Sequence, residues 1–247
     1  MSDKPAFGRD AAAFLRSLGR DPQATGELSS SEADAGVRIT ALSASGDDRV
    51  RVQVRVFNPA GSEEVEFLLL RRLSADMNLQ VGELEPEILP EIEYWSEVTR
   101  AYFSACASFA YTPSSLKALE RKLWQKSFER DVARDAVDLV RESGFVNEAE
   151  IALRRAQIFV TKRWGRTRIF MKLREEGFEE SAMEQAKRYL DEVDFAENCA
   201  ALIAKKYGSV PDDRHERELM YASLSRSGYS SADIRLAMEK CAKKNRS

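Results

Sequence analysis

The greatest concentration of like charge in this 247-residue sequence is a basic block from Ile151 to Arg174, which contains no aspartate or glutamate. Its eight cationic side chains are those of Arg154, Arg155, Lys162, Arg163, Arg166, Arg168, Lys172 and Arg174. Such side chains donate charge-assisted hydrogen bonds, so the block predicts contact with an anion, either a DNA phosphate or an acidic protein side chain. If one helix continues through Gly165, then Arg155, Lys162 and Arg166 share a face. The alternative interpretation is a solvated helical face without a partner.

Other residues that could do chemistry are few. His215 is the only histidine, and its charged surroundings favour the exposed start of a helix over a catalytic or zinc site. Cys106, Cys199 and Cys241 are too widely spaced for a C-x-x-C motif, and we expect no disulfide. The acidic residues at 191–194 favour a capping or solvated role over metal binding, and no glycine-rich phosphate-binding motif occurs. We therefore expect no enzyme, metal or cofactor.

Charge is distributed unevenly along the chain. Residues 1–111 carry 11 basic and 18 acidic side chains, whereas residues 112–247 carry 27 basic and 23 acidic ones. The two halves therefore differ in electrostatic role. No apolar stretch is long enough for a membrane span or a secretion signal, and we expect a cytoplasmic protein.

The chain divides by pattern into an N-terminal segment, a β-rich region and a helical region. Residues 1–34 predict a short helix followed by a flexible polar linker. Residues 35–90 predict a small antiparallel sheet, because apolar residues alternate with polar ones at 37–42, 50–56 and 65–69. Three strands bury little apolar surface alone, so we expect this sheet to pack against the helix after Pro90.

Beyond residue 90 the sequence repeats itself. The pattern L-x-x-x-[SG]-[FY] begins at Leu123, Leu173 and Leu224, and each copy predicts a helix, a tight turn and a second helix. The leucine and the aromatic residue should meet in the core, and a third helix, such as 148–164, should complete each bundle. The fold class is therefore mainly α: three tandem three-helix repeats at 91–155, 156–205 and 206–247, forming an elongated curved array.

These residues carry a resemblance to the RecX family over roughly positions 100–240. Lys122 to Phe128 resembles the family's K-L-x-x-K-G-[FY], and Gly144 to Ala152 resembles its G-[YF]-[LI]-[DN]-D-x-x-[FY]-A. Gly165 to Phe178 resembles the more specific G-x-x-R-I-x-x-x-L-x-x-K-G-[IF]. The sequence departs from these patterns at Ser127, Glu148 and Glu176, where the family usually has Gly, Asp and Lys.

The resemblance implies a monomeric regulator in DNA repair and the SOS response that binds the filament of RecA on single-stranded DNA. It also implies inhibition of the ATPase and strand exchange of RecA. By its charge, the basic block is the expected contact with the filament or its DNA. Two alternatives stay open. Paired short helices are also typical of helix-turn-helix DNA-binding regulators, and the acidic pI of about 5.6 is compatible with an adaptor that contacts no nucleic acid.

Overall fold

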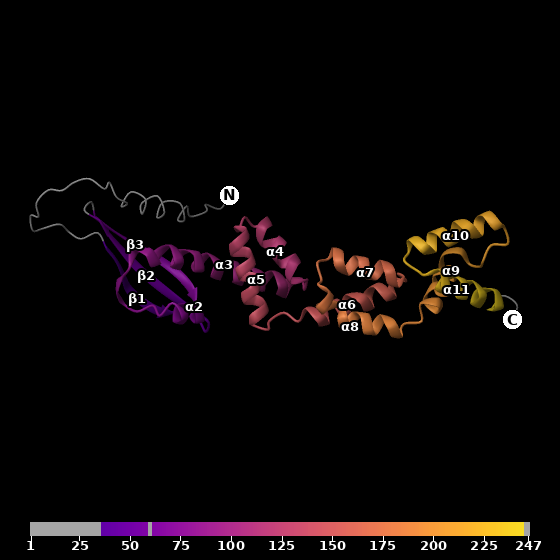
Figure 1. Cartoon of the computed structure of the whole chain (residues 1–247), viewed down its shortest axis with the longest axis horizontal. Coiled ribbons are helices and arrows are strands. Elements are labelled where there is room, and N and C mark those ends of the chain that lie inside the picture. The colour runs from indigo at the N-terminus through magenta and orange to yellow at the C-terminus, as the bar shows by residue number, and fades with distance from the viewer. Residues whose placement is uncertain (1–35, 59–60, 245–247) are drawn as a thin grey trace, which may run out of the picture. The chain divides into compact units, whose positions relative to one another are not determined.

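The computed structural model describes residues 36–58 and 61–244. They form a small antiparallel sheet followed by helices to the C-terminal end, which confirms the predicted mainly α class with a preceding sheet (Figure 1). The predicted helix and linker of residues 1–34 lie outside the described residues. Two compact units are distinguished by their internal contacts. Unit 1 contains the described residues up to Ser104 and a second segment, Phe128–Ala136. Unit 2 contains Ala105–Ser127 and the described chain from Val137 onward.

The sheet of unit 1 contains four strands in the order β3-β2-β1-β4. The bounds are β1 (Gly36–Ala44), β2 (Arg49–Asn58), β3 (Gly61–Leu70) and β4 (Gly82–Leu84). All neighbouring strands are antiparallel, which confirms the three predicted strands. Strand β4 was not predicted, because three residues are too few to show a period of two.

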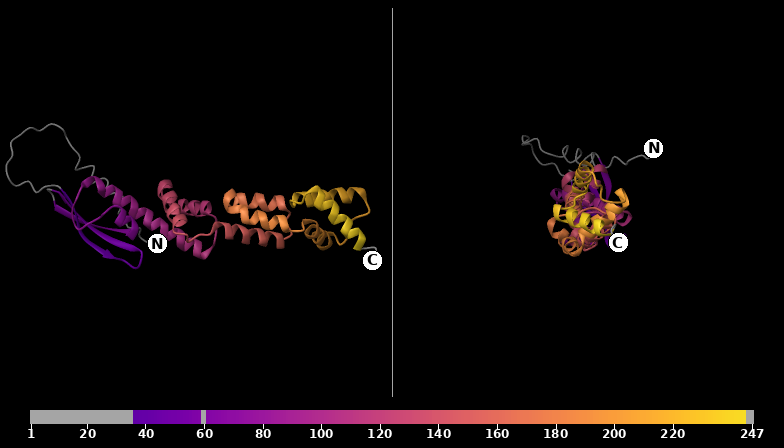
Figure 2. Two further views of the ribbon diagram at one scale, coloured as in Figure 1. Left: turned by 60° about the horizontal axis from the view of Figure 1, so that its bottom comes forward. Right: turned by 90° about the vertical axis from the view of Figure 1, so that its right-hand side faces the viewer.

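One face of the sheet packs against the N-terminal part of α3 (Leu89–Tyr111), and Figure 2 shows the two elements together. Val52 and Val54 are fully buried in this core. Leu70 donates its backbone N–H to the buried hydroxyl of Thr99 at 3.1 Å, which satisfies a donor on an edge strand. The predicted packing of the sheet against the helix after Pro90 is therefore confirmed. The short helix α2 (Arg71–Asp76) connects β3 to β4, and η1 (Pro86–Ile88) connects β4 to α3.

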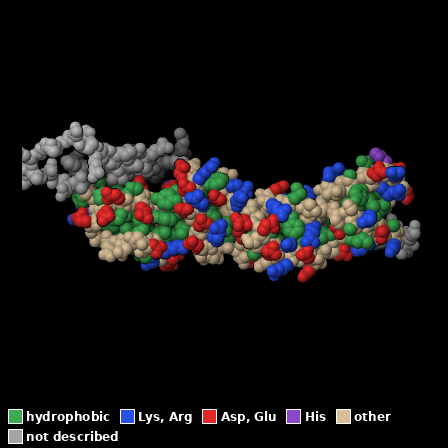
Figure 3. Space-filling view, viewed as in Figure 1, with side chains coloured by type: hydrophobic (Ala, Val, Ile, Leu, Met, Phe, Trp, Pro, Cys, Tyr) green, Lys and Arg blue, Asp and Glu red, His purple; other side chains and the backbone are tan. Residues whose placement is uncertain are grey.

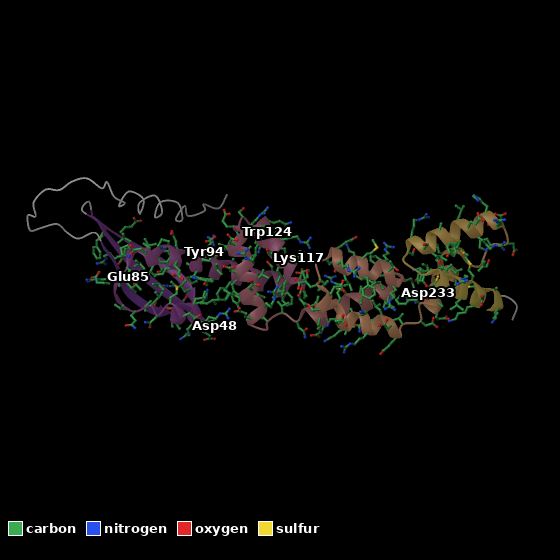
Figure 4. The ribbon with its side chains drawn as sticks, viewed as in Figure 1. Asp48, Glu85, Tyr94, Lys117, Trp124 and Asp233 are labelled. Atoms are coloured by element: carbon green, nitrogen blue, oxygen red, sulfur yellow. The ribbon has the colours of Figure 1, made fainter. Side chains whose placement is uncertain are left out.

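Helix α3 is also joined to a later helix within unit 1. Tyr94, labelled in Figure 4, donates its hydroxyl to the carboxylate of Asp135 at 2.6 Å. Burial, followed by this hydrogen bond, raises the pKa of Tyr94 to about 12. The guanidinium of Arg100 lies 5.2 Å from the ring centroid of the half-buried Phe128, which is the aromatic residue of the first repeat.

The remaining helices follow the repeat. Their bounds are α4 (Leu116–Gln125), α5 (Arg130–Glu142), α6 (Glu148–Thr161), α7 (Arg166–Glu175), α8 (Glu180–Glu192), α9 (Phe195–Tyr207), α10 (Arg214–Arg226) and α11 (Ser231–Lys244). Repeat 2 consists of α6, α7 and α8, and repeat 3 consists of α9, α10 and α11. Repeat 1 contains α4 and α5 after α3. Helices α6 and α9 cross positions 155 and 205, where the sequence analysis divides the repeats.

The turn after the middle helix has the same left-handed backbone in each repeat. Ser127, Gly177 and Gly228 have φ values of 68°, 91° and 90°. Such a residue ends a helix by directing the following N–H back to an unpaired carbonyl, as Phe178 does to Leu173 at 3.1 Å. The leucine and the aromatic residue are buried in one core in repeats 2 and 3, which confirms that part of the prediction.

Candidate partner-binding surface

Helix α6 ends at Thr161 and α7 begins at Arg166, so no single helix carries the whole basic block. The intervening loop contains Arg163, whose backbone is left-handed with φ of 60°, and Gly165, which is the N-cap of α7. The continuous helix that would align Arg155, Lys162 and Arg166 is therefore not formed. The condition for a shared face is not met, because the left-handed residue breaks the helical path.

Five cations of the block form ion pairs. The pairs are Arg154–Glu150, Arg155–Glu176 at 3.7 Å, Arg166–Asp191, Lys172–Glu175 at 3.2 Å and Arg174–Glu180 at 2.6 Å. Most of these carboxylates lie just outside the block in sequence. Acidic and basic side chains are interspersed over the helices in Figure 3. The positive charge of this segment is thus largely balanced within the fold.

Lys162, Arg163 and Arg168 have no carboxylate partner in the part of the chain that the structure describes. All three are exposed, and they lie in or beside the loop between α6 and α7. The Arg168 guanidinium lies 4.0 Å from the ring centroid of Trp164. Trp164 in turn stacks on Phe159, with 4.6 Å between centroids and 4° between planes. The indole therefore supports Arg168 and is not a free platform for a base.

The loop is held by backbone contacts with repeat 3. Gly165 donates its N–H to the carbonyl of Ser227 at 2.8 Å, and Thr167 donates to that of Gly228 at 3.2 Å. The first N–H groups of a helix have no partner within the helix and often bind anions. Here repeat 3 occupies two of these donors. Side-chain cations must therefore provide any anion contact at this point.

A buried polar network fixes the same loop from the other side. The Tyr229 hydroxyl lies 2.8 Å from the carbonyl oxygen of Arg163 and 3.1 Å from Oδ1 of Asn198, while Nδ2 of Asn198 donates to the Val160 carbonyl at 3.1 Å. Burial raises the pKa of the Tyr229 hydroxyl. Asn198 was not predicted as a site residue from the sequence. A polar residue on an otherwise apolar helix face was the available signal for a buried network.

Repeats 1 and 2 are joined by a comparable contact. The buried hydroxyl of Ser115 donates to the carbonyl of Glu176 at 2.6 Å and accepts from the N–H of Ala118 at 3.1 Å. The carboxylate of Glu148 accepts the N–H of Leu116 at 2.8 Å, and burial is the largest cause of the raised pKa of Glu148. Figure 4 labels Lys117, the residue of α4 that follows Leu116. Of the two departures from the family pattern at this contact, Glu148 connects the repeats through its side chain, and Glu176 does so through its backbone carbonyl.

The other sequence candidates are structural. Asp194 caps α9 by accepting the N–H of Glu197 at 2.8 Å, which confirms the capping prediction, and this bond is the largest cause of its lowered pKa. His215 is exposed in the first turn of α10. The cysteines are not paired in disulfides. No group of three or more potential metal ligands occurs within residues 36–58 and 61–244. Across those same residues, every helix is too short or too polar to cross a membrane.

The sequence matches no family profile and no curated protein. Solved structures do match. One is described as the crystal structure of regulatory protein RecX, and its TM-score is 0.63 at 16% identity, over 82% of this chain and 99% of that chain. Another, RecX from Lactobacillus salivarius, has a TM-score of 0.51 at 18% identity, over 59% of this chain and 97% of that chain. The chain therefore has the fold of the RecX proteins, as its repeat motifs implied.

Proposed function

We propose that this protein is a non-catalytic, cytoplasmic regulator of the RecA recombinase. It binds the filament that RecA forms on single-stranded DNA and mostly inhibits ATP hydrolysis and strand exchange. The observation that carries the proposal is the RecX fold together with the repeat motifs from Lys122 to Phe178. The protein acts as a monomer, and its basic block lies at the contact with the filament or its DNA.

The charge distribution sets the expected share of DNA contact. Five of the eight cations are already paired with carboxylates, so at most Lys162, Arg163 and Arg168 are available to phosphates without breaking an ion pair. Each phosphate contact on a single strand contributes about −0.7 to the log–log salt slope, so three give about −2. This slope is modest. The larger part of the filament affinity then comes from contacts with RecA itself.

Titration of the protein into a DNA-dependent ATPase assay of RecA tests the proposal. We expect hydrolysis to fall at less than one protein molecule per RecA subunit, because one molecule that blocks a filament affects many subunits. Pull-down with RecA, single-stranded DNA and a slowly hydrolysed nucleotide should recover the protein with the filament. Unchanged hydrolysis and strand exchange at saturating protein would reject the function.

A helix-turn-helix regulator is the alternative. In that motif the N-terminal residues of the recognition helix contact base edges in the major groove. In repeat 2 the helix that follows the glycine turn is α8, whereas the N-terminus of α7 is packed against repeat 3 through the carbonyls of Ser227 and Gly228. A specific regulator should prefer one duplex by about 10³-fold or more. Gel shifts with unrelated duplexes would reveal such a preference, and equal affinities would discard the alternative.

A further inference from the structure

An open groove of about 650 Å³ lies beside α7 where repeat 2 meets repeat 3, wholly within unit 2. Its lining includes Trp164, Arg168, Met171, Lys172 and Glu175 of repeat 2 and Arg226 of repeat 3. Ligand sites in proteins commonly enclose about 300–1,000 Å³, so a short peptide segment fits this volume. The sequence analysis did not anticipate the groove, because Arg226 lies far from the basic block in sequence.

Two guanidinium groups from different repeats reach this groove. Arg168 is held against the Trp164 ring at 4.0 Å, and the backbone of Gly228 packs against the base of its side chain. A guanidinium stacked on an aromatic ring keeps its N–H edges directed outward for bidentate bonds to an acceptor. Among the described residues, neither Arg168 nor Arg226 has a carboxylate within ion-pair distance. Both are therefore available to an anionic group that enters the groove.

The remaining lining residues discriminate between kinds of anion. Met171 is 56% exposed, and its flexible thioether suits contact with an aliphatic side chain. Glu175 lies in the same groove, 3.2 Å from Lys172, and would repel a continuous row of phosphates. Trp164 already stacks within the protein. A nucleic-acid strand gains little from these groups, whereas a peptide that places an aliphatic side chain beside a carboxylate satisfies them.

We propose that this groove docks an acidic peptide segment of a protein partner. A carboxylate of the segment bonds to Arg168 and Arg226, and a neighbouring aliphatic side chain packs on Met171. The inference deepens the proposed function and rests on it only for the identity of the partner, since the chemistry of the groove applies to any such segment. Because both cations are exposed, added salt weakens the binding.

Fluorescence anisotropy of the full chain with a labelled Asp-Glu-Leu-Glu-Asp peptide tests the docking. We expect saturable binding that Arg168→Ala and Arg226→Ala each weaken by about tenfold, through loss of charge-assisted hydrogen bonds. Arg188→Ala, which removes an exposed arginine of α8 outside the groove, is the matched control and should bind as the wild type does. Replacing the peptide leucine with serine should weaken binding to the wild type but not to Met171→Ser.

Two results overturn the proposal. The first is equal peptide affinity in all folded variants. The second is displacement of the peptide by oligothymidylate, together with a loss of oligothymidylate affinity in Arg226→Ala as large as the loss of peptide affinity. Thermal unfolding of each variant confirms that it is folded. RecA ATP hydrolysis measured in parallel separates the two hypotheses. Peptide binding without inhibition of RecA contradicts the proposed function alone. Inhibition of RecA that Arg226→Ala leaves intact, without peptide binding, contradicts the groove alone.

Discussion

Gly165 and Gly228 pack backbone against backbone, and neither position has room for a Cβ. A Cβ on Gly165 would overlap the carbonyl group of Gly228, and a Cβ on Gly228 would lie 2.5 Å from the backbone nitrogen of Arg168. This close approach allows the N–H of Gly165 to reach the Ser227 carbonyl at 2.8 Å. The connection between repeats 2 and 3 therefore depends on a pair of glycines, one from each repeat.

Gly228→Ala should lower the free energy of unfolding by more than the cost of placing alanine in a left-handed backbone conformation. A left-handed residue other than glycine costs about 1–2 kcal/mol, and the clash with Arg168 adds about 1–3 kcal/mol. Gly144→Ala is the matched control, because Gly144 also has a positive φ, of 67°, but has open space around its Cβ position. Urea unfolding of both variants measures the difference. Equal losses in free energy of unfolding would contradict the backbone contact.

Ser127→Gly should stabilise the protein by about 0.5–1 kcal/mol. Ser127 has φ of 68° at the position where the other repeats carry glycine, and glycine adopts this conformation without steric cost. The gain in stability is smaller than the steric cost of a left-handed serine, because glycine has more conformational freedom in the unfolded chain. Gln185→Gly, at an exposed site inside α8, should instead cost about 1 kcal/mol. A loss of stability in Ser127→Gly would show that the serine side chain contributes to the turn.

Tyr229→Phe should lower the free energy of unfolding by about 1–3 kcal/mol, because it removes a buried hydrogen bond and leaves a polar partner unsatisfied. The carbonyl of Arg163 and the amide of Asn198 both lose the hydroxyl. Tyr111→Phe, at a side chain that is 92% exposed, controls for the chemical change and should be neutral. Chemical unfolding of the two variants measures the two losses of stability. If Tyr229→Phe is as stable as Tyr111→Phe, water replaces the Tyr229 hydroxyl.

Local features of this fold could be predicted from sequence, whereas contacts between helices could not. The turns at Ser127, Gly177 and Gly228 follow from adjacent residues, because helix termination is a local property. The pairing of Arg166 with Asp191 depends on how α7 and α8 pack, and no spacing rule predicts it.

The electrostatics of the candidate site show the same division. The Arg154–Glu150 pair has helical i, i+4 spacing and could have been read from the sequence, but Glu150 lies one residue outside the block as it was defined. The groove of Arg168 and Arg226 joins residues of two repeats and required the three-dimensional structure. A charge run read from the sequence therefore overstated the free charge of the segment.

Glu148→Gln should gain stability relative to the wild type as pH rises. Burial raises the pKa of Glu148 above its ordinary 4.5, so the folded state binds the proton more tightly than the unfolded state. The resulting stabilisation is complete below pH 4.5 and is lost as pH rises through the raised pKa. Glutamine keeps an acceptor for the N–H of Leu116 but cannot ionise. Urea unfolding of both proteins at about pH 4 and about pH 7 measures the stability of Glu148→Gln minus that of the wild type. A stability difference that falls towards neutral pH contradicts the raised pKa of Glu148.

Substitution of the unpaired loop cations should change the salt dependence of single-stranded DNA binding more than substitution of the paired ones. Lys162 and Arg163 have no carboxylate partner among the described residues, whereas Arg154 and Arg174 pair with Glu150 and Glu180. Replacing Lys162 and Arg163 with alanine removes two phosphate contacts and should flatten the log–log slope by about 1.4. The Arg154→Ala, Arg174→Ala double variant has the same net charge and serves as the control. If both double variants flatten the slope equally, the ion pairs open on binding and the whole block contacts DNA.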